Sequence, residues 1–341
     1  GTDFATWVDG MPVNLRSHAH GQGYTDINFL IPEMIQELEY RKGPYYAEVG
    51  DFSSAGAAQF NTYTRLDRNI VKAATGQDGY RRGLVAGSAD LGRGAVTFAG
   101  EATGYDGPWV DISEDLRKYN GLLRYGTRGD GRRWDVTLMG YDADWNSADQ
   151  IPERAVKEGL VRRLGSLDTY VGGNTHRYSL STRLVQDWDR SQTRINLYAI
   201  DYELKLFSNF TYLLDDPVNG DEFEQSENRR IYGGLLEHHY DAKLFDRSVA
   251  HRFGLEFRYD DVDDIGLYQT LARQRLDTIR QDDIEEASSA VYYAGDVLWS
   301  PRLRTVFGLR YDYYDFDVDS DDPRNSGKEN DSLWSPKFSG I

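Results

Sequence analysis

The residues best suited to binding chemistry lie in one stretch near the amino terminus, 14–24, with the sequence NLRSHAHGQGY. On an extended backbone, alternate side chains point to the same side. This stretch would then present a cation, two imidazoles, an amide and a phenol together, from Arg16, His18, His20, Gln22 and Tyr24. Two imidazoles spaced in this way could share a metal ion if a third ligand converged on them. The alternative, that these side chains only hydrogen-bond the segment to the rest of the protein, stays open, and we predict no metal site.

Aromatic residues and acidic runs form further groups of candidates. Trp109, Trp145 and Tyr212, together with Phe223, fall in predicted long connections and could stack on a flat or sugar-like ligand, or equally pack against neighbouring parts of the protein. Two acidic runs, 260–264 and 315–322, could attract a cation such as calcium. Neither has the spacing of an EF-hand loop, so we interpret both as solvated loop tips.

Several classes of function have little support. The sequence has no cysteine, which excludes thiolate metal sites and cysteine nucleophiles. It has no G-x-S-x-G, H-E-x-x-H or G-x-x-x-x-G-K motif, so we predict neither an enzyme nor a bound cofactor. A formal charge of -17 argues against a nucleic-acid partner, because phosphate binding requires a dense basic surface.

Composition and periodicity predict an all-β protein. The 24 Tyr, 14 Phe and 7 Trp residues favour pleated strands, and the 34 Gly residues favour tight turns. Many segments alternate with period two; between 251 and 259, for example, the odd positions are aromatic or aliphatic apart from His251, and the even positions are Arg, Gly and Glu. Strands are predicted at 70–76, 80–90, 94–105, 118–127, 132–144, 176–187, 192–206, 229–241, 249–261, 285–299 and 303–315, and another begins at Leu333.

The predicted connections alternate between short and long. Short ones lie at 91–93, 128–131, 188–191 and 300–302, and long ones at 106–117, 146–175, 207–228, 262–284 and 316–331. This alternation is typical of an antiparallel transmembrane β-barrel, in which tight turns lie at one rim and functional loops at the other. A soluble β-rich carbohydrate-binding or hydrolytic protein is the alternative. Residues 31–41 are the exception to the strand pattern and predict a short helix between Pro32 and Gly43-Pro44.

The first part of the chain carries three motifs: Val8-Asp9-Gly10 with Pro12, then LEYRKGP at 38–44, then Val49-Gly50 with AGAA at 55–58. In this order they resemble the carboxyl half of the plug domain of TonB-dependent outer-membrane receptors. The resemblance implies a partial α+β plug at 1–68 inside a partial barrel at 69–341, which would be eleven or twelve strands of a larger barrel of about 22. It also implies plug-to-barrel contacts at Glu39 and Lys42, and further wall strands after Ile341. Lys42 departs from the family's Arg and would make a less well oriented contact.

The resemblance further implies a function in the bacterial outer membrane. Such a receptor takes up a scarce nutrient, which could be a siderophore, cobalamin, an oligosaccharide or a metal chelate. Its partners would be this ligand, outer-membrane lipid and the TonB-ExbB-ExbD complex, whose contact site lies outside this chain. A passive porin or structural barrel is the alternative, and it would not need the plug motifs.

Overall fold

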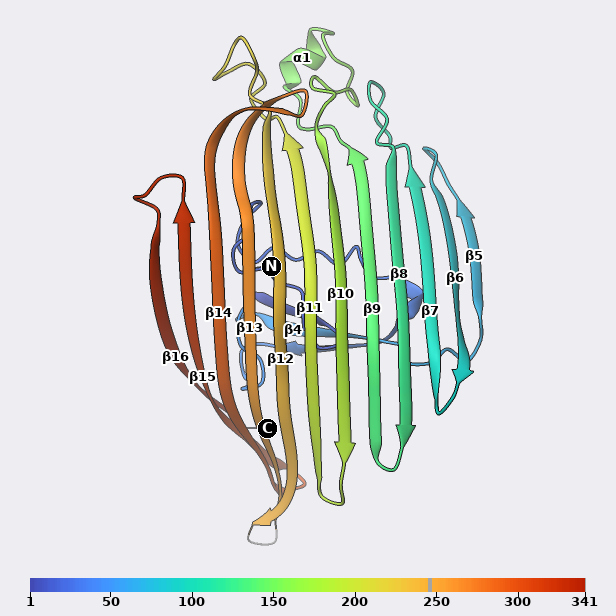
Figure 1. The fold of residues 1–341 in the computed structure, drawn as a ribbon, viewed down its shortest axis with the longest axis vertical. Helices are drawn as coiled ribbons and strands as arrows, with labels where there is room; N and C mark the ends of the chain where they lie inside the picture. Colours follow the sequence, from blue (N-terminus) through green and yellow to red (C-terminus); the bar gives the residue numbers. More distant parts are fainter. Residues whose placement is uncertain (245–246, 341) are drawn as a thin grey trace.

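Twelve strands form one curved antiparallel sheet in chain order, β5 to β16, in a computed structural model that describes residues 1–244 and 247–340 (Figure 1). Ile341, after which further strands are expected, lies outside the described residues. The sheet is open, with β5 at one edge and β16 at the other. Its strands are β5 (Ile70–Thr75), β6 (Arg81–Leu91), β7 (Gly94–Tyr105), β8 (Leu116–Gly129), β9 (Arg132–Asn146), β10 (Gly172–Asp187), β11 (Ser191–Ser208), β12 (Phe223–Leu244), β13 (Arg247–Leu271), β14 (Gln274–Ser300), β15 (Leu303–Ser320) and β16 (Gly327–Gly340).

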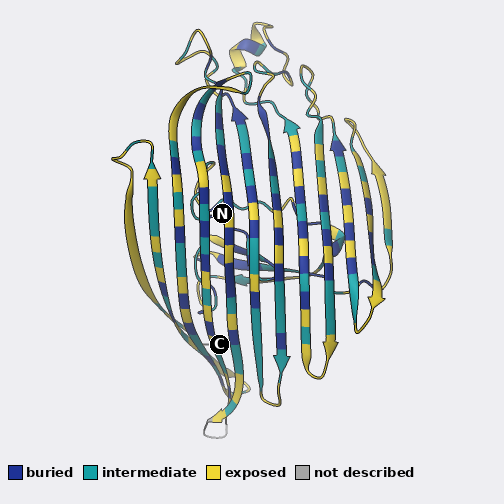
Figure 2. Ribbon diagram, viewed as in Figure 1, coloured by how far each residue is buried: buried dark blue, intermediate teal, exposed yellow. Residues whose placement is uncertain are grey.

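The two faces of this sheet, which we call the wall, reverse the usual pattern of a soluble protein. On β13, the outward-facing Phe253, Leu255 and Phe257 are 48%, 53% and 51% exposed. Arg258 and Asp260, on the opposite face, are only 7% and 0% exposed. Figure 2 shows this alternation along the length of the neighbouring strands. A wall that exposes apolar side chains and buries charged ones has one face suited to lipid and one suited to a polar lumen.

The predicted alternation of short and long connections is present. Tight turns at 92–93, 130–131, 188–190 and 301–302 lie at one end of the wall. At the turn between β8 and β9, Asp130 and Gly131 have φ values of 50° and 69°, a left-handed conformation that Asp and Gly tolerate. The connections 106–115, 147–171 and 209–222 lie at the other end, where the short helix α1 (Glu153–Lys157) is found (Figure 1).

One predicted long connection is wrong. Residues 262–284 continue β13 and β14 as a long hairpin, closed by the two-residue turn Ala272-Arg273, whose φ values are 52° and 63°. Beyond the apolar band both faces of a strand contact water or polar loops, so its sequence loses the alternation on which the prediction relied. For the same reason the acidic run 315–322 lies mostly in β15 rather than in a loop.

Residues 1–68, which we call the plug, contain a separate four-stranded sheet in the order β2-β1-β4-β3. Its strands are β1 (Phe4–Val8), β2 (Met11–Pro12), β3 (Ile35–Lys42) and β4 (Gly56–Thr62), with β1 parallel to β4 and the other pairs antiparallel. The boundary at 68/69 stays a prediction, and it falls between β4 and β5.

The predicted helix at 31–41 is wrong. Only Pro32–Met34 form a helical turn, the 3-10 helix η1, and the chain then continues as β3. Leu38 to Lys42 pair with Phe60 to Gly56 of β4. An isolated helix of this length is marginal in water, so pairing with an existing sheet prevails over local helix signals.

The plug lies against the polar face of the wall. In Figure 1 its segments cross behind the central strands. Arg124 of β8 contacts Asp9, Arg258 of β13 contacts the backbone oxygen of Asn14, and both contacts are buried. No helix in the described part of the chain is long and apolar enough to span a membrane.

Candidate functional site

The tip of the plug loop that carries the candidate histidines docks onto the wall, with most of its contacts on strand β12. Arg229 Nη2 donates to the backbone oxygen of Ser17 at 2.6 Å, and the backbone N–H of Ala19 donates to Glu227 Oε2 at 2.8 Å. Gln225 Nε2 donates to the backbone oxygen of Ala19 at 2.8 Å. These partners occupy alternate positions of β12, so they share its lumen-facing side. The strand therefore fixes both the position and the height of the loop.

His18 is buried at the centre of this contact, with a side chain that is 0% exposed. Its Nδ1 accepts the backbone N–H of His20 at 3.0 Å, which leaves the proton on Nε2, and Nε2 donates to Tyr202 Oη at 3.0 Å. The ring stacks on Tyr24 with centroids 3.9 Å apart. Burial, with a smaller effect from the nearby Arg229, lowers the pKa of His18 to about 2. A neutral, enclosed imidazole of this kind fits the structural alternative better than ligand contact.

Tyr24 stays stacked on His18, but the side chains of Arg16, His20 and Gln22 lie elsewhere. The backbone folds back between Leu15 and Tyr24, which form an isolated antiparallel bridge, so the segment is a tight loop and not the extended strand on which the shared face depended. His20 and Gln22 are exposed, and His20 Nδ1 contacts Gln225 Oε1 at 2.9 Å. Tyr24 is half-buried, and burial raises its pKa to about 12. Among the described residues no group of three or more His, Asp or Glu side chains is placed to hold a metal ion.

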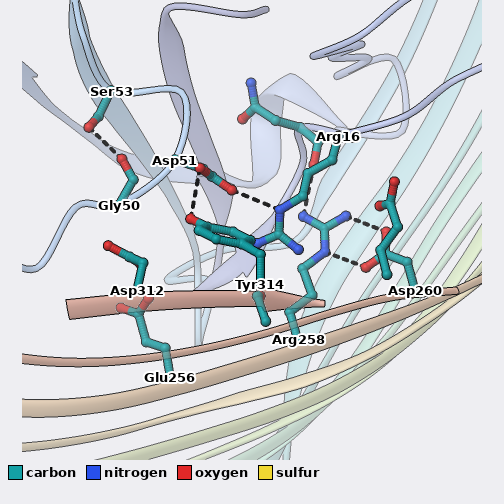
Figure 3. Close-up of polar contacts among 12 residues, drawn as sticks. Arg16, Gly50, Asp51, Ser53, Glu256, Arg258, Asp260, Asp312 and Tyr314 are labelled. Carbon is teal, nitrogen blue, oxygen red and sulfur yellow. Dashed lines mark hydrogen bonds and ion pairs between the residues drawn. The ribbon is translucent and has the colours of Figure 1, made fainter. Parts of the chain in front are cut away.

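Arg16 points to a different part of the lumen, where a cavity of 490 Å³ separates plug from wall. Its Nε donates to Asp51 Oδ2 at 2.7 Å and its Nη2 to Ser288 Oγ at 2.9 Å, while Tyr314 Oη donates to the other oxygen of Asp51 (Figure 3). Arg310 Nη2 lies 2.7 Å from Glu256 Oε2 across the same cavity. The lining charges are thus mostly paired, and such a cavity is suited to water and polar solutes.

Asp260 corrects the interpretation of its acidic run as a solvated loop tip. It is fully buried in β13, where Arg258 Nε donates to its Oδ1 at 2.6 Å (Figure 3). Arg229 Nη1 donates to its Oδ2 at 2.8 Å. Two guanidinium groups compensate the buried carboxylate, as a charge removed from water requires. This residue contributes to the plug-facing network and is not available to an outside cation.

Comparison with known families identifies the family of this protein. The family described as "TonB dependent receptor-like, beta-barrel" matches residues 62–341. The chain belongs to the TonB-dependent receptor family. Proteins of this family are outer-membrane β-barrels, and the outer membrane is the location of this receptor. Comparison with the curated proteins gave no match.

Solved structures share the fold of the receptor at low sequence identity. The unliganded ferric citrate transporter FecA has a TM-score of 0.77 at 13% identity, over 98% of this chain and 51% of that chain. The copper transporter OprC gives 0.70 at 17% identity, over 98% and 52%, and the siderophore receptor PiuA from Acinetobacter baumannii gives 0.72 at 12%, over 98% and 54%. The chain therefore spans about half the length of these structures.

The aromatic candidates of the receptor separate into two groups. Trp109 and Tyr212 lie in outer connections, and Tyr212 Oη donates to the backbone oxygen of Gln150 at 2.7 Å. The prediction that Trp145 and Phe223 lie in loops is wrong, since Trp145 belongs to β9 and Phe223 begins β12. Trp145 packs against the main apolar cluster of the receptor interior. Both strands run further toward the outer rim than their sequences suggest.

The outer connections are tied together by Arg273 at the tip of the β13–β14 hairpin. Its Nη2 donates to Asn146 Oδ1 at 2.8 Å and to the backbone oxygen of Val171 at 3.0 Å. Its own backbone N–H donates to Glu222 Oε1 at 2.8 Å. The hairpin tip thus reaches past β12 and β11 to the ends of β9 and β10, and Figure 1 shows it arching over the outer rim.

Glu39 and Lys42 are exposed on β3. Asn61 Nδ2 donates to Glu39 at 3.2 Å, and the Lys42 ammonium lies 6.0 Å from the Tyr40 ring centroid, so both contacts are within the plug. In the described residues the nearby ion pair that joins plug to wall is Glu48 with Arg252. A plug-to-wall role for Glu39 and Lys42 stays a prediction.

Sequence reasoning missed the wall residues that hold the plug, above all Arg124, Glu227 and Arg229. Each is an inward-facing charged residue of an alternating strand. The position of a residue in this alternation indicates that its side chain faces the lumen. It does not identify the partner, because the partners are backbone atoms and turns of a distant segment.

Proposed function

We propose that the receptor imports a scarce small-molecule or metal-chelate ligand across the outer membrane, driven by the TonB-ExbB-ExbD complex. The observation that carries the proposal is the plug held against the lumen-facing side of the wall. A passive pore gains nothing from a folded segment in its lumen, whereas an energised receptor needs a closed state that force can open.

The chemistry of the plug–wall contact supports a movable plug. Besides an apolar cluster to which plug and wall both contribute, the contact includes many hydrogen bonds and ion pairs, such as Arg229 with Ser17, Arg16 with Ser288 and Arg82 with Glu33. Water can replace such partners as they separate, so the net free energy of each is small compared with its strength in a dry interior. The 490 Å³ cavity already provides space for water beside the plug.

We place ligand recognition at the outer side of the plug. His20 and Gln22 are exposed there, and Trp109 and Tyr212 lie in the outer connections. The neighbours named for ferric citrate, copper and a siderophore make iron chelates and metal complexes the first ligands to test, with cobalamin and oligosaccharides after them. The aromatic rings suit any of these by stacking.

The test is uptake by the full-length receptor in paired strains with and without a working TonB system. A panel of radiolabelled ferric chelates, cobalamin and oligosaccharides would be supplied at nanomolar concentration. We expect one class to accumulate inside the cell only when both receptor and TonB system are present. Uptake that needs the receptor and ignores TonB would instead assign a passive pore.

A further inference from the structure

Three neighbouring strands place glycine at the same height on the outward face of the wall. Gly100 of β7 pairs with Gly121 of β8, which pairs with Gly140 of β9. A Cβ at Gly100 or Gly121 would meet no atom within 4 Å, and one at Gly140 would meet only the Tyr178 ring, at 3.4 Å. None of the three has the positive φ that requires glycine. Internal packing and backbone conformation therefore do not account for glycine here, although glycine weakens a strand.

Gly121 and Gly140 form part of the floor of an outward-facing groove of 620 Å³ that continues across β10 to β12. The next outward-facing row toward the short turns is Leu123, Leu138 and Leu180, which pair in register and are 49%, 49% and 48% exposed. Ala199 and Tyr232 continue this leucine row, whereas Tyr178 continues the glycine row beyond Gly140. The groove thus has a shallow floor at Gly121 and Gly140, with an aliphatic ridge along one side.

The other end of the groove is charged. Asp201 of β11 and Arg230 of β12 pair in register, line the groove and are both exposed. Asp201 is 3.0 Å from His176, and Arg230 is 3.8 Å from Asp261. Beyond this row, toward the long connections, the outward side chains include Asp142 and Glu203. The groove therefore lies where the apolar band of the wall meets its polar outer zone.

We propose that this groove binds one phospholipid molecule whose headgroup carries both a phosphate and an ammonium. An acyl chain lies over Gly121 and Gly140 against the leucine ridge, the phosphate contacts Arg230, and the ammonium contacts Asp201. The groove is continuous with the lipid-facing surface of an outer-membrane barrel, so its occupant comes from the bilayer. The acidic outer zone favours a zwitterionic headgroup over a polyanionic glycolipid, which Asp142, Asp201 and Glu203 would repel.

The physical basis is packing and headgroup pairing rather than the hydrophobic effect. Hydrocarbon chains already surround the wall, so transfer into the groove gains little from leaving water. Missing side chains at Gly121 and Gly140 let an acyl chain approach the backbone and contact atoms on three sides. Close dispersion contacts of this kind are individually weak and collectively large.

The test uses the full-length receptor in nanodiscs, with native mass spectrometry of the retained lipid. The discs would contain phosphatidylethanolamine, phosphatidylglycerol or lipopolysaccharide. Gly121→Leu and Gly140→Leu fill the groove, and Gly83→Leu is the matched control, because Gly83 is an exposed, outward-facing position with no atom near its would-be Cβ and lies outside the groove. Leu at lipid-facing strand positions is compatible with folding. The difference in gel mobility between heated and unheated samples would check that each variant is folded.

We expect the wild type and Gly83→Leu to retain one phosphatidylethanolamine and both groove variants to lose it. Arg230→Gln should weaken retention about two- to fivefold, the range for losing one exposed charge contact. Equal retention by the groove variants and the wild type would overturn the proposal. So would retention of lipopolysaccharide or phosphatidylglycerol in place of phosphatidylethanolamine. Ligand uptake tests the proposed transport function separately, so an absence of uptake would not contradict the retention of the lipid.

Discussion

Asp9 of the plug and Arg124 of β8 form an ion pair with an Oδ2–Nη2 distance of 2.6 Å, and both side chains are almost completely buried. Asp9 also accepts the backbone N–H of Thr62 at 2.9 Å and the Thr62 hydroxyl at 2.6 Å. Asp9 and Gly10 have φ values of 49° and 83°, so a tight turn directs the carboxylate toward the wall. The Val-Asp-Gly motif therefore both closes a turn of the plug and docks the plug onto the wall.

Replacing Asp9 by Asn should release the plug at lower denaturant concentration. The change removes the nearer of the two carboxylates that face the buried Arg124 guanidinium, since Asp135 lies 3.8 Å away, and breaking one partner of a buried pair costs up to about 3–5 kcal/mol. Because the chain has no cysteine, a single cysteine introduced at an exposed plug position can carry a fluorescent label. The urea midpoint of plug release would then be compared with that of the wild type.

Asp90→Asn is the control for this experiment. It removes an ion pair with Arg65 in which both side chains are more than half exposed, and such solvent-screened pairs contribute little to stability. An Asp9→Asn midpoint no lower than that of Asp90→Asn would show that the Arg124 contact does not hold the plug.

The docking of the His18 loop should weaken in acid. The pKa of His18 is about 2 when docked, against 6.5 for the free side chain, so the released loop takes up a proton first. Docking is therefore fully stable above about pH 6.5 and loses up to about 1.4 kcal/mol per pH unit as the pH falls toward 2. The groups that face the ring are Tyr202, Glu227 and Arg229 from the wall and Tyr24 and His20 from its own loop.

Hydrogen exchange of residues 15–24 at pH 7.5, 6.5 and 5.5 would measure this dependence. His18→Gln should remove the component between pH 6.5 and 5.5, whereas His20→Gln, at an exposed position, should preserve it. An identical pH dependence in wild type and His18→Gln would show that His18 does not control the loop.

Ligand binding should separate the candidate residues that the sequence grouped together. His20→Ala and Gln22→Ala remove exposed polar side chains at the outer side of the plug, and each should weaken binding by about three- to tenfold, as expected for one hydrogen bond. Both variants should keep the wild-type hydrogen exchange of the loop. The check is the dissociation constant of the ligand class found in the uptake panel, and unchanged constants for both variants would move the recognition site away from this loop.

The alternation of apolar and polar residues was sufficient to predict the strands of the wall, their antiparallel order and the two kinds of rim. The prediction succeeded because lipid favours apolar side chains on one face of each strand and the lumen favours polar side chains on the other. The prediction failed at 262–284, where the β13–β14 hairpin leaves the apolar band and both faces of each strand are polar. At 31–41 a local helix signal was overridden by pairing with β4, which is separated from β3 by a loop and leaves no mark in the local sequence.

The candidate site was predicted less well, for a related reason. The prediction for the His18 loop assumed an extended backbone, and the bridge between Leu15 and Tyr24 turns the alternate side chains in different directions. The partners that fix these side chains, such as Tyr202 and Gln225, lie about two hundred residues away in the chain. Pattern within a segment can indicate which side chains face the lumen, but it cannot indicate which of them meet there.

The Arg273 contacts predict that the outer connections move as a unit. Arg273→Ala removes the side-chain hydrogen bonds to Asn146 and to the 147–171 connection, each worth about 1 kcal/mol, so local opening of that connection should become about ten- to a hundredfold more frequent. Limited proteolysis and hydrogen exchange of residues 147–171 would measure the opening. The control is Arg324→Ala, at another outer connection, because Arg324 is paired only with Asp322 of its own turn in the described residues. If Arg273→Ala opened 147–171 no more than Arg324→Ala does, the hairpin tip would be a passive neighbour of the loops and would not hold them together.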